Sequence, residues 1–261
     1  GGGVVTVGTK AFSPLWGCFG GMLITVDYFL TSAISSVSGM HYLSSVFPVL
    51  DGRAVSLAIL ALVLLAAINI IGIRESAMVS LVMAISALGV DLLVTALALA
   101  QVGPRELFAM VGRALSEGQG ASMQTLLIGF GSAWLAFSGL ESISQLSPAM
   151  NLPIQKTSKR GMLLVVFTVL LTSLPLTLLS TALLPSAVKN QNSSRFISEL
   201  GLAVGGFPAQ AAVVATASLL LLFAANTAII GGYHVFMALA NQEVPAKPTI
   251  LTPATIGLTV T

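Results

Sequence analysis

The chain alternates long apolar runs with short polar stretches. Six of the runs are long enough to cross a bilayer, which takes about 20 residues in a helix. Proline, glycine and charged residues stand at their ends, where helices are expected to stop. The predicted spans are residues 15–47, 54–73, 76–101, 123–148, 161–184 and 208–240. The first and last are longer than a perpendicular helix needs, so both are expected to tilt or to extend beyond the membrane.

The composition supports a membrane protein. Hydrophobic residues make up 56% of the chain and charged residues 8%, whereas a soluble domain has about 25% charged residues. The predicted fold class is all-α, a polytopic membrane helix bundle. No basic run with interleaved aromatic residues points to nucleic acid. The single cysteine, Cys18, excludes an internal disulfide, and neither histidine has a second ligand at metal spacing, so no metal or cofactor is predicted.

The most informative polar position is Asp27, a carboxylate inside the first span. It begins a row of oxygen-bearing side chains that lie within about 80° of one another on a helix. The row is Asp27, Thr31, Ser35, Ser38 and Tyr42. An ionised carboxylate in hydrocarbon costs about 3 kcal/mol and persists mainly where it faces a cavity or a partner. We interpret the row as part of a path for a substrate, an ion or a proton. The alternative is a structural carboxylate tied to a neighbouring helix.

Two more acidic residues lie within predicted spans, while all 11 basic residues lie outside them. Glu141 stands where serine and glycine interrupt an apolar run, and we expect a broken helix whose backbone groups line a cavity. A continuous helix packed through its small residues is the alternative. Asp91 is either a proton site or a partner of another helix. Asn226 and Thr227, in the last span, either join helices or coordinate an ion through their oxygens.

The connections give an orientation. Lys and Arg near the span ends are divided almost evenly between the two sides, so their total does not decide it. Lys156, Lys159 and Arg160 crowd one short loop, which is expected to face the cytoplasm. No stretch has the pattern of a soluble domain, so residues 1–261 are predicted to form a single membrane domain. Both ends of the sequence look cut, and we expect a fragment that is inactive alone.

Several motifs resemble, in order, the third to eighth helices of the amino acid, polyamine and organocation permeases. The motifs are Val26-Asp27-Tyr28 with Thr31, Asn69 to Ser76, Phe137 to Ser144 running to Pro153, and Asn226 ahead of Asn241-Gln242-Glu243-Val244-Pro245. The resemblance covers nearly the whole chain. It implies a partial LeuT-type fold, in which two inverted five-helix repeats meet and this chain holds the end of the first and the start of the second.

The resemblance also implies a secondary active transporter of the cell membrane that works by alternating access. In the amino acid permeases, the broken sixth helix offers backbone and hydroxyl groups to the substrate, and H⁺ or Na⁺ is the coupling ion. In the potassium-importing branch, the corresponding cation site falls on Asp27, Tyr28, Thr31, Ser35 and Ser138. We place amino acids or related organocations first, because they are the larger class, and proton-coupled potassium import second.

The candidate binding residues come from three spans. They are Asp27, Tyr28, Thr31, Ser35, Phe137, Ser138, Gly139, Glu141, Asn226 and Thr227. Asp27 is expected to change its protonation or ion occupancy as the bundle rocks. The expected partners are the lipid bilayer and a small molecule or cation, with no nucleic acid. An enzyme is not expected, because the order Asp27-Tyr28 and the Gly89-Val90-Asp91 sequence both fail the motifs of intramembrane aspartyl proteases. The sequence sets no oligomeric state.

Overall fold

A computed structural model describes residues 3–71, 77–136 and 152–240. Within these residues the secondary structure is helical, with no strand. The elements are α1 (Gly3–Ala11), α2 (Pro14–Val46), η1 (Pro48–Leu50), α3 (Ala54–Ile71), α4 (Ala77–Gln101), α5 (Pro104–Gln119), α6 (Met123–Ala136), α8 (Ile154–Leu183), α9 (Ser186–Gln191), η3 (Ser193–Arg195) and α10 (Phe196–Ala240). The predicted all-α polytopic bundle is confirmed, while the inverted-repeat arrangement stays a prediction.

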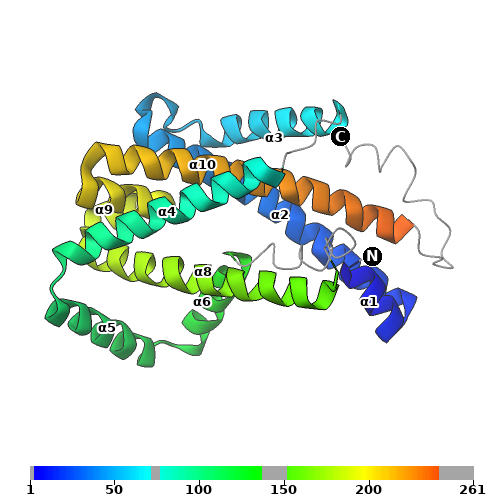
Figure 1. The fold of residues 1–261 in the computed structure, drawn as a ribbon, viewed down its shortest axis with the longest axis horizontal. Coiled ribbons are helices and arrows are strands. Elements are labelled where there is room, and N and C mark those ends of the chain that lie inside the picture. Colours follow the sequence, from blue (N-terminus) through cyan, green and yellow to red (C-terminus); the bar gives the residue numbers. More distant parts are fainter. Residues whose placement is uncertain (1–2, 72–76, 137–151, 241–261) are drawn as a thin grey trace.

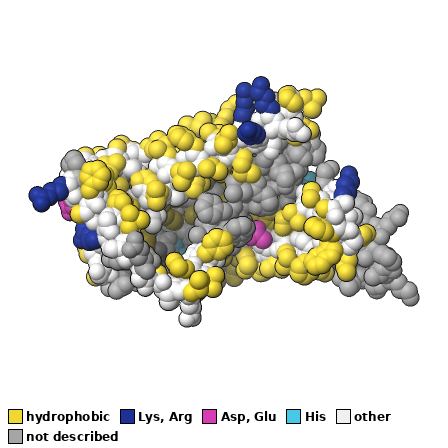
Figure 2. Space-filling view, turned by 90° about the horizontal axis from the view of Figure 1, so that it is seen from below, with side chains coloured by type: hydrophobic (Ala, Val, Ile, Leu, Met, Phe, Trp, Pro, Cys, Tyr) yellow, Lys and Arg dark blue, Asp and Glu magenta, His cyan; other side chains and the backbone are white. Residues whose placement is uncertain are grey.

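Five of the described helices are long and apolar enough to cross a bilayer, namely α2, α3, α4, α8 and α10. Each overlaps one of the predicted spans. The fourth predicted span, 123–148, begins as α6, and its part beyond Ala136 lies outside the described residues. Figure 2 shows hydrophobic side chains over much of one face, with Lys and Arg at its margins. A surface of this kind matches a surrounding of lipid rather than water.

Two helices begin earlier than the hydrophobic pattern predicts. The first two turns of α8 contain Lys156, Lys159 and Arg160, whose polarity hides a helix that starts at Ile154. The long helix α10 starts at Phe196 and bends at Gly206, which has φ 67° and ψ −165°. The bend divides α10 into segments 196–205 and 207–240. The glycines and proline that suggested a helix start around residue 208 mark this bend instead.

The helices α2 and α10 run antiparallel through the middle of the bundle (Figure 1). Gly21, near the start of α2, lies against Leu239 at the end of α10, and Gly39 lies against Ser218. In the view of Figure 1, α3 lies on one side of this pair and α8 on the other, while α4 crosses the pair and contacts α10 and α8. We call the end where α1 meets the start of α2 the α1 end. The opposite end, where α9 and η3 meet the end of α2, is the α9 end.

Three clusters of buried side chains hold these helices together. The cluster at the α9 end joins α4, α5, α8 and both segments of α10, and it consists of Val94, Ala98, Val102, Met110, Leu176, Leu179, Leu200 and Val213. The cluster at the α1 end consists of Val5, Tyr28, Ala228 and Val235. The third joins α2 to α3 through Met40, Ala54 and Ala58. The α2–α10 pair therefore contributes to the packing along its whole length.

Candidate transport site

Tyr28 lies where α2 and α10 approach closely. Its side chain is only 4% exposed, and its ring lies against Gly231 of α10. A Cβ atom added at Gly231 would lie 2.7 Å from Cζ of Tyr28 and 3.0 Å from Cε1. The absence of a side chain at this position is what lets the α10 backbone reach the ring, as small residues do between membrane helices. Tyr28 thus sets the distance between the two helices beside Asp27.

The row that begins at Asp27 is partly buried along α2. Asp27, Thr31 and Ser35 are each of intermediate exposure, and successive members are one helical turn apart. Asp27 is turned by about 100° from Tyr28 around the helix, and so it does not face Gly231 directly. No Lys or Arg occurs within α2, α3, α4, α6 or α10. These five helices therefore offer oxygen atoms and negative charge to the described interior, and no basic side chain.

The row leads toward the α9 end. Tyr42, its last member, packs against the cluster that contains Val94 of α4. Asp91, one turn earlier on α4, is partly buried, and its backbone oxygen accepts a hydrogen bond from Thr95 Oγ1 at 2.7 Å. The two open interpretations of Asp91, a proton site or a partner of another helix, both stay predictions.

The two candidates from α10, Asn226 and Thr227, lie in different surroundings. Asn226 is 7% exposed, and its Oδ1 accepts a hydrogen bond from Nδ2 of Asn69 on α3 at 2.6 Å. Thr227 is exposed, and its hydroxyl donates to the Phe223 carbonyl oxygen in its own helix at 2.9 Å. Asn226 therefore joins two helices, whereas Thr227 does not contribute to this contact. Asn69 was absent from the candidates, although a carboxamide in the otherwise apolar α3 is a visible signal.

Four candidates, Phe137, Ser138, Gly139 and Glu141, lie outside the described residues. Their part in a binding site, and the broken helix expected around them, stay predictions.

A groove of about 410 Å³ lies between α2, α3 and α10. Its lining is mostly apolar, with Phe29, Leu62 and Phe236 among its members, and it contains no charged side chain. The hydroxyls of Thr25 and Ser32 also line it, and they donate to carbonyl oxygens of α2 itself. Asp27 and Thr31 are not part of this lining. Because an apolar groove offers little to a cation or to a zwitterion, we do not assign it to the substrate.

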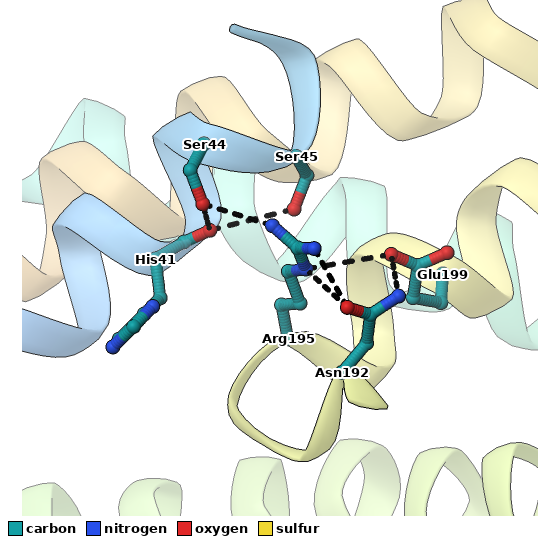
Figure 3. Close-up of polar contacts among 6 residues, drawn as sticks. All are labelled: His41, Ser44, Ser45, Asn192, Arg195 and Glu199. Carbon is teal, nitrogen blue, oxygen red and sulfur yellow. Dashed lines mark hydrogen bonds and ion pairs between the residues drawn. The ribbon is translucent and has the colours of Figure 1, made fainter. Parts of the chain in front are cut away.

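A second polar cluster lies at the α9 end. Nη1 of Arg195 donates to Ser44 Oγ of α2 at 2.9 Å, and its Nε and Nη2 donate to Asn192 Oδ1 at 3.1 and 2.6 Å. The Arg195 Nε atom is also 3.6 Å from Glu199 Oε1. Figure 3 shows the guanidinium group between the end of α2 and the turn before α10. The sequence analysis did not identify this cluster, because Arg195 and Ser44 are 151 positions apart.

A bundle of membrane-spanning helices with a partly buried carboxylate and a row of hydroxyls is typical of the polytopic membrane transport proteins. The profile of the family described as "Amino acid permease" matches residues 1–245. The chain belongs to this family, within the amino acid, polyamine and organocation superfamily, and the resemblance seen in its motifs is confirmed. Family membership indicates a transporter rather than an enzyme.

The chain is also similar to a curated protein, "Potassium transporter KimA" of Bacillus subtilis (strain 168). The two are 32% identical over 170 residues, which cover 61% of this chain and 27% of the relative. The similar region therefore spans little more than a quarter of the relative's length.

Proposed function

We propose that the full-length protein carries potassium ions across the cell membrane by alternating access, with Asp27 as the charged ligand. The observation that carries the proposal is the partly buried row of Asp27, Thr31 and Ser35 in a bundle whose helices α2, α3, α4, α6 and α10 contain no Lys or Arg. Oxygen atoms replace the hydration shell of potassium, and a carboxylate at this depth requires a positive partner. A potassium ion meets both requirements.

The similarity to a protein named as a potassium transporter moves this substrate ahead of amino acids. The other groups of the proposed site are Tyr28, next to Asp27, and Ser138, which lies outside the described residues. Amino acids remain the second candidate, because the matching family is described as "Amino acid permease". The hydroxyls of Thr31 and Ser35 could donate hydrogen bonds to the carboxylate of an amino acid. None of these side chains carries a positive charge to balance that carboxylate, and Asp27 repels it.

We further propose that proton movement drives uptake: a proton enters together with the potassium ion, and Asp27 changes its protonation or ion occupancy as the bundle changes conformation. Potassium uptake should then acidify the cell interior.

The test measures uptake of rubidium and of labelled amino acids by cells that produce the full-length protein. Asp27→Asn keeps the shape of the side chain and removes its charge, and it should lower rubidium uptake about 30-fold or more, as expected for the loss of a buried charge partner. The matched control is Asp51→Asn. Asp51 is an exposed acid just after η1, and its substitution should leave uptake unchanged.

The outcomes separate the two substrates. Amino acid uptake without rubidium uptake, lost in Asp27→Asn, would replace potassium by an amino acid. Normal rubidium uptake by Asp27→Asn would make the carboxylate structural and overturn the proposed site.

A further inference from the structure

The contact between Asn69 and Asn226 fixes the direction of both side-chain amides. Nδ2 of Asn69 donates to the Leu65 carbonyl oxygen at 2.8 Å and to Asn226 Oδ1 at 2.6 Å. A backbone carbonyl can only accept, so the Asn69 atom beside Leu65 must be the nitrogen. The second N–H of this nitrogen then requires an acceptor on Asn226. The Asn226 oxygen is therefore directed at α3, and its NH₂ group is directed away from Asn69.

This pair lies close to the proposed site along α10. Asn226 precedes Gly231 by five residues, which corresponds to about 7.5 Å along a helix. Gly231 is the residue that contacts Tyr28, the neighbour of Asp27. Asn226 is also almost fully buried, between Ala225 at 0% and Ala228 at 3% exposure. Asn69 thus sets the direction of the Asn226 amide at a point about one and a half turns along α10 from Gly231, which lies near the level of Asp27.

We propose that Asn69 is a positioning residue, which holds the Asn226 carboxamide so that Asn226 acts in transport as a hydrogen-bond donor and not as an oxygen ligand of the ion. An NH₂ group repels a cation and binds a carbonyl or carboxylate oxygen. The inference rests on the proposed function for the identity of the ion. It differs from a simple tie between helices, because a tie requires only that the two amides be bonded, in either direction.

The variant Asn69→Asp distinguishes the effect of the direction of the Asn226 amide from the effect of the hydrogen bond between α3 and α10. When the introduced carboxyl group is ionised it only accepts, so Asn226 must turn its NH₂ group toward α3. When the group is protonated, its O–H donates to Asn226 Oδ1 as the Asn69 amide does. The helices stay bonded in both states. Rubidium uptake relative to the parent protein should fall about tenfold at pH 8 and recover toward the parent value at pH 5, while the melting temperature in detergent changes little between these pH values.

Two further variants complete the test. Asn226→Asp keeps an oxygen for Asn69 and removes the NH₂ group, and it should lower rubidium uptake about tenfold; an ion ligand would instead gain from the added negative oxygen and keep or lower its KM. Asn69→Leu removes the bond, and its uptake should fall by a factor that does not depend on pH. The matched control is Thr216→Val, which removes a hydroxyl that bonds only to carbonyl oxygens of its own helix α10.

Either of two results overturns the inference. One is full rubidium uptake by Asn226→Asp, which would make Asn226 an oxygen ligand. The other is a ratio of Asn69→Asp to parent uptake that stays flat from pH 5 to pH 8, which would make the pair a simple tie. If the parent protein carries no rubidium, the proposed substrate has failed. The same variants are then compared with the labelled amino acid that the parent takes up, and the pH ratio still decides the role of Asn69.

Discussion

The two ends of the α2–α10 pair are held together in different ways. At the α1 end the contacts rely on glycine, since an added Cβ at Gly21 would lie 2.8 Å from both Leu239 and Val5. At the α9 end α10 bends at Gly206, and hydrogen bonds from Arg195 connect the turn before α10 to the end of α2. Close packing needs regular backbones, whereas an irregular segment must have its polar groups satisfied by partners.

This difference gives the two ends opposite sensitivities. At the α1 end a substitution acts through the volume that it adds. At the α9 end the segment 196–205 of α10 is connected to α2 through Arg195 and Ser44, and to α4 through a hydrogen bond from Gln101 Nε2 to the Val204 carbonyl oxygen at 3.1 Å. A substitution there acts through the bonds that it removes. The following substitutions test this contrast by thermal unfolding of the full-length protein in detergent.

The largest effect is expected for Gly231→Val. Its Cβ would lie 2.7 Å from Cζ of Tyr28, so α2 and α10 must move apart, at a cost of about 3 kcal/mol. Gly232→Ala is the matched control, because an added Cβ there meets nothing within 4 Å, and alanine favours the helix by about 1 kcal/mol. Equal destabilisation by both variants would show that the helix approach at Tyr28 is not limited by volume.

Gly206→Ala should have the next largest effect. At φ 67° and ψ −165° the backbone is in a region that is nearly restricted to glycine, and a side chain there costs about 2 kcal/mol. The cost comes from conformation and not from volume, since the nearest atom to an added Cβ is Pro208 Cδ at 3.8 Å. Gly89→Ala in α4, where a Cβ meets nothing within 4 Å, should be stabilising. A neutral Gly206→Ala would mean that the bend does not limit the stability of the α9 end.

Arg195→Met should destabilise by about 1.5 kcal/mol, the value typical of hydrogen bonds to a charged group. It leaves Ser44 without its donor and Asn192 without two hydrogen bonds, although the apolar stem of the side chain is kept. The pairwise part is measured with Ser44→Ala and the double variant. A coupling free energy near zero would show that Arg195 acts through η3 and Glu199 alone and does not join α10 to α2.

The long apolar helices could be predicted from the sequence, because a bilayer requires long apolar runs. The contacts between neighbouring helices could not be predicted. The limits of α2 and α4 follow from an apolar run with punctuation at each end. The start of α10 does not follow from hydropathy, because the segment 196–205 packs on α4 and is separated from the rest of the helix by the bend at Gly206. Asp27 can be recognised from the sequence of α2 alone, since a charged residue in an apolar run is unusual whichever way its side chain points.

Asn69 and Gly231 gain their meaning only from their partners. Asn69 is 157 positions from Asn226, and neither amide reveals in the sequence that it faces the other. Gly231 is one of 25 glycines, and only the ring of Tyr28 makes it different from Gly232. The position of a residue within an apolar run indicates its depth in the membrane, but it does not indicate which helix packs against that residue.

The smallest effect is expected for Gln101→Leu, and it sharpens the contrast most. The variant removes one neutral hydrogen bond to the Val204 carbonyl oxygen, at a cost of about 1 kcal/mol. Since this bond and the bend at Gly206 hold the same segment of α10, combining Gln101→Leu with Gly206→Ala should give less than the sum of the two effects. Combining it with Gly231→Val, at the other end of the helix pair, should give the sum. Additivity in both combinations would show that the α9 end is not one cooperative unit.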